Sequence, residues 1–385
     1  MEKIFKIKLI ALLVIFLSGF WSFIIAQNNI RFAVIGDYGD NSSAEADVAN
    51  LVNSWNVDFI ITVGDNNYPG GEASTIDENI GQYYHQYIYP YTGNYGDGSN
   101  VNRFFPSLGN HDWHTNPPQP YYDYFELPNN ERYYDFVRGN VHFFAIDSDS
   151  DEPDGVKENS VQGQWLKNAM ALSTAKWQVV YFHHSPYSSC SHHGSQEYMQ
   201  WPFNEWGASV VFSGHDHVYE RLIVNGLPYF VNGLGGDSKY SFGSPVTGSE
   251  VRYNDDYGAM LVEANLDSMT FKFYSRDYVL VDSYTLHSPV TDVKNASVNT
   301  FKLEQNYPNP FNPKTNIRYT ISNKQFVSLK IYDIIGKKVA TLVNQEKPAG
   351  TYEVEFTSRN LSSGIYYYKL QVGDIVQTKK MILMR

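Results

Sequence analysis

The sequence predicts an α/β fold up to about residue 287, followed by a small all-β domain. Three observations lead to this prediction. Short apolar runs alternate with helical or loop segments in the first part of the chain, as in α/β proteins. After Tyr284 the pattern changes to alternating apolar and polar segments separated by glycines. The charge also changes sign, because residues 27–300 carry 13 Lys/Arg against 34 Asp/Glu, whereas residues 301–385 carry 13 against 6.

The first 26 residues have the pattern of a signal peptide. Three lysines within the first eight residues precede the apolar run Leu9–Ile25, and Ala26 is a suitable small residue before a cleavage point at Gln27. An uncleaved membrane anchor is the alternative, because an apolar run of this size approaches the length that spans a bilayer. No other stretch of the sequence is apolar enough for that.

Five apolar runs of the first part each end at a residue that can bind a metal ion. They are Arg31–Gly36 before Asp37, Phe59–Gly64 before Asp65, Phe104–Gly109 before Asn110, Trp177–Phe182 before His183, and Ala208–Gly214 before His215. We interpret each run as a buried strand, and Ser42–Trp55 as a crossover helix between the first two. Ligands of open α/β sheets bind at the C-terminal ends of the strands, where these residues are expected to meet.

These strand ends supply a set of donors that suits two metal ions. The candidate ligands are Asp37, Asp65, Tyr68, Asn110, His183, His215 and His217. With Asp65 as a bridge, each ion obtains four protein ligands. Carboxylate and phenolate oxygens favour a hard trivalent ion, and imidazoles with an amide suit divalent zinc, manganese or iron. Each motif alone could be an ordinary turn, but five in succession predict a binuclear site.

The charge of the first part excludes some functions. A domain with this excess of acidic residues lacks the basic surface that nucleic-acid binding requires. It would also repel phosphorylated substrates unless metal ions supply positive charge. The chain has one cysteine, Cys190, so no internal disulfide can stabilise an exported form.

The last part of the chain predicts a small all-β sandwich. The prolines of Tyr307–Pro313 are incompatible with a helix or a central strand. The expected strands beyond it are Asn316–Ile321, Val327–Tyr332, Tyr352–Phe356 and Gly364–Val372. The predicted organisation is a signal peptide at 1–26, a catalytic domain at 27–290, a linker at 291–304 and a final domain at 305–385.

The five motifs together resemble the blocks of the metallophosphoesterase superfamily. The blocks are Gly36–Gly39, Gly64–Tyr68, Gly109–Asp112, His183–Ser189 and Gly214–Arg221. A tyrosine three residues after the bridging Asp65 is specific to the purple acid phosphatase branch, and the small size resembles the tartrate-resistant acid phosphatases. The resemblance runs from about Phe32 to Leu286. It implies a four-layer α/β/β/α sandwich with the metal site at one edge of its sheets.

The resemblance also implies a distribution of the ligands between the two ions. Fe(III) would be held by Asp37, Asp65, Tyr68 and His217, and a divalent zinc, iron or manganese ion by Asp65, Asn110, His183 and His215. An ionised tyrosine on Fe(III) would give the purple colour. His183 fits the family spacing better than its neighbour His184, although Pro186 lies one residue later than the family pattern.

Catalytic roles follow from the same resemblance. His111 and His192 match the outer histidines that bind phosphate oxygens and protonate the leaving group, with His193 as a weaker match. Imidazole suits this work because it exchanges a proton near neutrality. Glu220 and Arg221 are expected to be structural, and Trp113 or His114 to shape the pocket.

The expected function is therefore that of a secreted acid phosphatase. It would hydrolyse phosphate monoesters by attack of a metal-bound hydroxide, with small phosphorylated compounds as substrates. The alternatives are a phosphodiesterase acting on nucleotides or phospholipid head groups, and a surface binding protein without catalysis.

The final domain has a resemblance of its own. Gln305–Pro313, Ile331–Lys337, Ser363–Tyr366 and Thr378–Met381 resemble the sorting domain of the type IX secretion system. This implies passage through the outer membrane, with the secretion machinery as a partner, and removal of the domain on arrival. A sandwich that binds sugar or docks a partner is the alternative.

Overall fold

A computed structural model describes residues 29–288, 302–321, 324–359, 361–372 and 375–384. The predicted signal peptide and most of the predicted linker lie outside these residues. The chain divides after Ser288 into two compact units, which are described separately. Within the described ranges, no helix combines the length and the apolar character that crossing a membrane requires.

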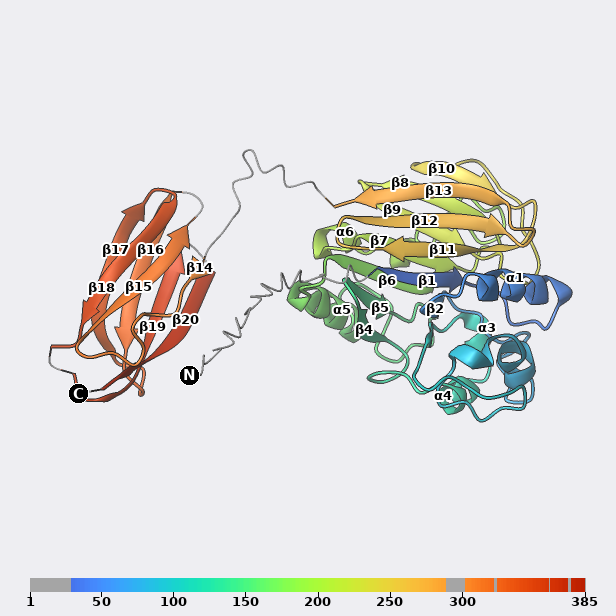
Figure 1. Cartoon of the computed structure of the whole chain (residues 1–385). Helices are drawn as coiled ribbons and strands as arrows, with labels where there is room; N and C mark the ends of the chain where they lie inside the picture. Colours follow the sequence, from blue (N-terminus) through green and yellow to red (C-terminus); the bar gives the residue numbers. More distant parts are fainter. Residues whose placement is uncertain (1–28, 289–301, 322–323, 360, 373–374, 385) are drawn as a thin grey trace, which may run out of the picture. The chain divides into compact units, whose positions relative to one another are not determined.

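The first unit contains two mixed β-sheets (Figure 1). The six-stranded sheet has the order β13 (Leu280–His287), β12 (Ser268–Ser275), β11 (Gly258–Ala264), β1 (Ile30–Ile35), β2 (Phe59–Thr62) and β3 (Phe104–Pro106). The seven-stranded sheet has the order β10 (Ser249–Tyr253), β8 (Tyr219–Val224), β9 (Leu227–Asn232), β7 (Val210–Gly214), β6 (Trp177–His184), β5 (Val141–Ala145) and β4 (Tyr134–Arg138). The strands β1, β2 and β3 run parallel, as do β5, β6, β7 and β9.

The main core lies between the two sheets and is rich in phenylalanine. Phe143 of β5 contacts Phe32 of β1 and Phe59 of β2 edge to face, with ring centroids 5.0 and 5.2 Å apart. All three side chains are buried. Strands covered on both faces need continuous apolar runs, which is why these segments do not alternate with polar residues.

Helices cover the outer faces and complete the four predicted layers. Helix α1 (Ser43–Ser54) lies on the six-stranded sheet, and α5 (Val161–Leu172) and α6 (Phe203–Trp206) lie on the seven-stranded sheet (Figure 1). The shorter helical segments are η1 (Asp77–Gly81), α2 (Gln82–Tyr84), η2 (His85–Tyr87), α3 (Asn110–Trp113), α4 (Gln119–Tyr124) and η3 (Glu197–Met199). The predicted α/β/β/α fold is confirmed.

The crossover helix begins where its sequence predicts. The hydroxyl of Ser42 accepts the backbone N–H of Glu45 at 3.1 Å, which satisfies one of the free donors of the first turn. A carboxyl oxygen of Glu45 in turn accepts the N–H of Asn41 at 2.7 Å. The five predicted strands are present as β1, β2, β3, β6 and β7, although β2 and β3 end two or three residues before the expected positions.

The second unit is a sandwich of two antiparallel sheets. One has the order β14 (Lys302–Leu303), β15 (Lys314–Ile321) and β18 (Gly350–Thr357). The other has the order β17 (Lys338–Lys347), β16 (Gln325–Tyr332), β19 (Gly364–Val372) and β20 (Ile375–Leu383). Its core includes the buried side chains of Ile317, Leu329 and Tyr368. All four predicted strands form, and Lys302 and Leu303, at the end of the predicted linker, pair with β15.

Candidate metal centre

The predicted ligands gather where strands of both sheets end. Asp37 follows β1 and Asp65 follows β2, whereas His215 follows β7 of the other sheet. These three residues have φ angles of 56°, 51° and 68°. Non-glycine residues rarely adopt this left-handed region, and such strained conformations concentrate at functional sites. The backbone therefore turns sharply at three of the seven predicted ligands.

Two glycines allow the backbone to pass close to the carboxylates. A β-carbon on Gly109 would lie 2.3 Å from Asp65 Oδ1, and one on Gly214 would lie 2.5 Å from Asp37 Oδ2. Contacts this short are impossible for a real side chain. The Gly that precedes Asn110 and the Gly that precedes His215 are thus required by the packing of the site.

Four predicted ligands meet around His183. Its Nε2 lies 3.0 Å from Asn110 Oδ1, 3.2 Å from Asp65 Oδ2 and 3.2 Å from His215 Nδ1. His183 and Asp65 are almost completely buried. This group corresponds to the predicted divalent site.

The other predicted ligands meet on the far side of Asp65. Tyr68 Oη lies 3.1 Å from Asp65 Oδ2 and 3.3 Å from His217 Nε2. His217 Nε2 is in turn 3.3 Å from Asp37 Oδ1. Asp65 Oδ2 is therefore shared between the two groups, as a bridging ligand must be.

The imidazoles are oriented by their second nitrogens. His183 Nδ1 lies 2.8 Å from the carbonyl oxygen of Val63, and His217 Nδ1 lies 2.8 Å from that of Ser238. A carbonyl only accepts, so each Nδ1 donates and leaves the lone pair of Nε2 directed toward the carboxylates. Lone pairs that face one another in a buried site require a cation between them. The residues present thus fit a pair of metal ions.

The charges of the site also favour a bound cation. Burial lowers the pKa of His183, but the carboxylate of Asp65 outweighs it and raises the pKa to about 10. Burial and the charges of Asp65 and Asp37 raise the pKa of Tyr68 well above its usual value. These two side chains therefore hold a proton when no ion is bound, and metal binding would release it.

His184 packs on His215, with ring centroids 4.3 Å apart, but it is hydrogen bonded outside this group. Its Nδ1 lies 2.9 Å from Ser148 Oγ, and burial together with the adjacent His183 lowers its pKa to about 3. It is a neutral supporting residue, which agrees with the preference for His183 as the ligand.

His111 lies at the mouth of the site. Its backbone N–H donates to Asp65 Oδ1 at 2.8 Å, and its side chain, 30% exposed, has Nε2 4.0 Å from Asp65 Oδ2. His114 is exposed beside it, with ring centroids 4.8 Å apart. Trp113 is instead buried and donates to Asp147 at 2.8 Å, so it supports the pocket from behind.

The structure separates the roles of His192 and His193. The ring of His193 stacks on His215, with centroids 3.9 Å apart, so it lies directly above a predicted ligand. The ring of His192 contacts Tyr240 instead, at 4.3 Å. The spacing of the sequence favours His192, whereas the geometry places His193 closer to the metal-binding atoms.

Sequence reasoning missed two residues of the site. Asp237 Oδ2 lies 3.3 Å from His217 Nδ1, and the ring of Tyr240 stacks on that of His217. A usable signal was present, because the apolar strand β9 is followed by glycines and then Asp237, as a glycine precedes the candidate ligand in four of the five recognised motifs.

Glu220 and Arg221 have the structural roles that the sequence predicts. The buried carboxylate of Glu220 accepts the N–H and hydroxyl of Ser189 at 2.6 and 2.5 Å. Arg221 donates to both carboxylate oxygens of Asp282, at 2.7 and 3.3 Å. Glu220 thus joins β8 to the loop after β6, and Arg221 joins it to β13 of the other sheet.

Comparison with known proteins supports the same interpretation of the chain. Residues 30–219 match the calcineurin-like phosphoesterase family, and residues 305–384 match the secretion system C-terminal sorting domain. Purple acid phosphatase 15 of Arabidopsis thaliana is 27% identical over 54% of this chain and 45% of its own length. Human tartrate-resistant acid phosphatase type 5 is 24% identical over 54% of this chain and 73% of its own length.

Solved structures show the same fold. Purple acid phosphatase PPD1 from seeds of yellow lupin (Lupinus luteus) superposes with a TM-score of 0.55 at 17% identity, over 67% of this chain and 54% of its own. The matched region of this chain therefore spans about half the length of purple acid phosphatase 15 and of PPD1. It carries a calcineurin-like phosphoesterase domain related to purple acid phosphatases, followed by a type IX sorting domain that directs its export to the cell surface or the medium.

Proposed function

We propose that the first unit is a binuclear acid phosphatase that hydrolyses phosphate monoesters. Asp37, Asp65, Tyr68 and His217 would hold Fe(III), and Asp65, Asn110, His183 and His215 would hold a divalent zinc, iron or manganese ion. The observation that carries this proposal is the shared position of Asp65 Oδ2, which lies 3.2 Å from His183 Nε2 and 3.1 Å from Tyr68 Oη. A pair of ions supplies an activated water and neutralises the charge of the phosphate.

The residues of the chain bind and protonate the substrate. Because Nδ1 of His111 donates to the carbonyl of Pro69 at 2.6 Å, this residue at the mouth can donate from Nε2 to a phosphate oxygen when its ring is doubly protonated. A protonated imidazole there can pass a proton to the leaving oxygen, which becomes an alcohol. His193, stacked on His215, is the second candidate for this role, and His192 the third.

The test compares monoesters and diesters over a range of pH. The full chain, loaded with Fe(III) and Zn(II), is assayed with p-nitrophenyl phosphate and bis-p-nitrophenyl phosphate between acidic and alkaline pH. We expect faster cleavage of the monoester and an acidic optimum. A preference for the diester with a neutral or alkaline optimum would instead assign the protein to the phosphodiesterases.

A second measurement tests the Fe(III) site without reference to activity. Tyr68 loses its proton only beside a strongly positive ion, because burial and two carboxylates favour the neutral phenol. The iron-loaded protein should therefore show a visible charge-transfer band that the Tyr68→Phe variant lacks. An unchanged band in the variant would remove Tyr68 from the ligand set.

A further inference from the structure

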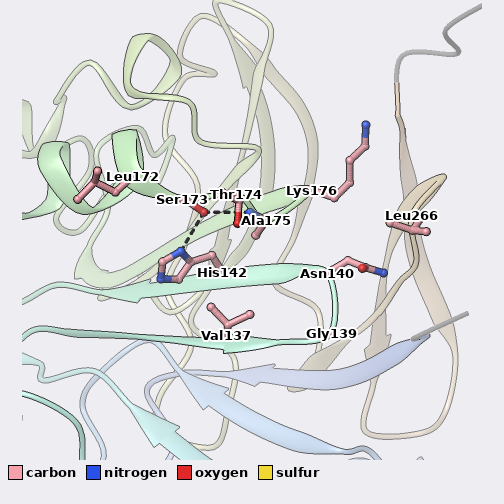
Figure 2. A pocket seen from close by; sticks show the side chains of 10 residues that line it. All are labelled: Val137, Gly139, Asn140, His142, Leu172, Ser173, Thr174, Ala175, Lys176 and Leu266. Atoms are coloured by element: carbon pink, nitrogen blue, oxygen red, sulfur yellow. Dashed lines mark hydrogen bonds between the residues drawn. The ribbon is translucent and has the colours of Figure 1, made fainter. Parts of the chain in front are cut away.

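A cavity of about 660 Å³ opens at the opposite end of the seven-stranded sheet, between the start of β6 and the end of α5 (Figure 2). Ser173, which follows α5, and His142 of β5 both line it. His142 pairs with Gln178 in the sheet, five residues before His183. At about 3.3 Å per residue, the cavity lies roughly 16 Å from the metal centre along β6. It is thus a separate site.

Three side chains in and beside this cavity form a continuous chain of hydrogen bonds. Ser173 Oγ lies 2.9 Å from His142 Nδ1, and His142 Nε2 lies 2.8 Å from Asp135 Oδ2 (Figure 2 shows the first of these contacts). Asp135 Oδ1 also accepts the side-chain amide of Asn129 at 3.3 Å. A carboxylate can only accept, so His142 donates from Nε2 and accepts the hydroxyl proton of Ser173 at Nδ1.

The fold holds these groups in register. Strands β4 and β5 are antiparallel, with Asp135 opposite Phe144 and Val137 opposite His142. Asp135 and His142 are therefore diagonal neighbours on one face of the sheet, the face that α5 covers. The ring of His142 packs on Phe144 at 4.1 Å, and only 12% of its side chain is exposed. The imidazole is thus fixed between its two partners.

The end of helix α5 adds a favourable field. Ser173 is its C-terminal cap, and the last turn contains no basic side chain. The negative end of the helix dipole therefore favours a positive charge nearby, such as the imidazolium that forms when His142 takes a proton. Nucleophile, base and orienting carboxylate are all present and hydrogen bonded in the order that activated serines require.

From this geometry we propose that the cavity is a second, metal-independent hydrolytic site, in which Ser173 attacks small carboxylic esters. His142 would be the base and Asp135 the positioning residue. In the first step Ser173 Oγ bonds to the carbonyl carbon, its proton moves to His142 Nδ1, and the alkoxide leaves with that proton as an alcohol. Water then attacks the acyl-serine with His142 again as base, releasing the acid and restoring the hydroxyl.

The lining of the cavity indicates the class of ester. Val137, Leu172 and Leu266 are apolar and strongly exposed, at 52%, 82% and 43%. They suit a short apolar acyl or alcohol group. Among the lining residues, Lys176 carries the one positive charge and Asn140 the one side-chain amide, although Figure 2 shows both side chains directed away from Ser173.

Covalent labelling tests this proposal on the full chain. Diisopropyl fluorophosphate forms a bond from phosphorus to an activated serine oxygen and releases fluoride, with the serine proton taken by the base. We expect one adduct, mapped by mass spectrometry to Ser173, with and without a metal chelator. The chelator should abolish phosphatase activity but leave the labelling of Ser173 unchanged, because this labelling needs no metal. The labelling therefore tests the serine site independently of the proposed phosphatase function.

Variants show whether Ser173 is labelled because its hydroxyl is activated by His142 or only because it is exposed. Ser173→Ala should remove the adduct and lower p-nitrophenyl acetate hydrolysis by about 100-fold or more. Asp135→Asn should slow the labelling without changing the probe concentration at half-maximal rate. Ser54→Ala is the matched control, because Ser54 also ends a helix but donates to Leu51 O rather than to an imidazole. Absence of an adduct, or its persistence in Ser173→Ala, would overturn the proposal.

Discussion

The ring of Tyr240 lies parallel to that of His217, with centroids 4.1 Å apart and planes inclined by 8°. The backbone N–H of Tyr240 also donates to the carbonyl of His217 at 3.0 Å. Stacking on one side and the Nδ1 contacts with Ser238 and Asp237 fix the imidazole in one orientation. Groups that orient a ligand in this way commonly affect metal affinity by about 10- to 100-fold.

Removal of this stack should loosen the metal. Tyr240→Ala should release Fe(III) to a chelator about 10-fold faster or more, because His217 can then rotate away from Asp37. Tyr240→Phe keeps the stacked ring and should behave like the parent protein. The release of Fe(III) is measured as the loss of the visible charge-transfer band. Equal rates in both variants would show that the stack does not position His217.

The bridging carboxylate should be essential for turnover. Asp65→Asn keeps the hydrogen bond from the backbone of His111 but loses the charge between the two metal groups. We expect phosphatase activity to fall by at least about 10³-fold, with the circular dichroism spectrum unchanged. Asp58→Asn is the control, since Asp58 precedes the same strand at the opposite edge and accepts the N–H of Arg31. Activity retained in Asp65→Asn would contradict the ligand assignment.

Stability should depend on pH through Glu45. Burial raises its pKa well above the usual value in the folded protein, against backbone hydrogen bonds from Asn41 and Asp40. The folded state therefore holds a proton that the unfolded state has lost, so stability decreases as pH rises from the unfolded pKa toward the folded one. The slope for one proton is about 1.4 kcal/mol per pH unit.

Urea denaturation at several pH values measures this slope. In Glu45→Gln, the slope of the free energy of unfolding against pH should be less negative by about 1.4 kcal/mol per pH unit. This change should appear above the unfolded pKa of a glutamate, about 4.3. Glu78→Gln is a close control, because Glu78 accepts from Asn41 as well but is exposed. If the slope of Glu45→Gln equals that of the parent, Glu45 does not carry the proton.

The Arg221–Asp282 pair should matter more for stability than surface pairs do. Their side chains are only 13% and 9% exposed, and Arg221→Ala would leave a nearly buried carboxylate beside Tyr219. A loss of about 3–5 kcal/mol in the free energy of unfolding is expected. Lys272→Ala breaks a more exposed pair with Glu263 and should cost less than about 1 kcal/mol. Similar losses in both variants would show that burial is not the deciding factor.

The sequence predicts the fold and most of the metal centre because both depend on local patterns. Buried parallel strands must be continuous apolar runs, and the residues that follow them must share an edge. Asp37, Asp65 and Asn110 follow the neighbouring parallel strands β1, β2 and β3, so they can be placed together from the order of residues alone, whereas His215 belongs to the other sheet. The glycines before Asn110 and His215 belong to the same local patterns.

Other features depend on contacts that spacing does not encode. The order of His192 and His193 along the chain does not determine which ring reaches His215, because the turn between β6 and η3 sets their directions. The stack of Tyr240 on His217 joins a residue after β9 to one after β7. The chain Asp135–His142–Ser173 depends on the register of β4 with β5 and on where α5 ends.

The proposed ligands come from both sheets, with Asp37, Asp65 and Asn110 on one and His183, His215 and His217 on the other. Neither sheet alone could then hold the two metal ions. The ions would therefore bind late in folding, after the two sheets have packed together. The two bound ions would cross-link the two sheets. Disulfides have this role in other exported proteins, but this protein has only one cysteine. Ligands anchored in two sheets would slow the release of the ions, which would help the protein to keep its metals in surroundings that contain few.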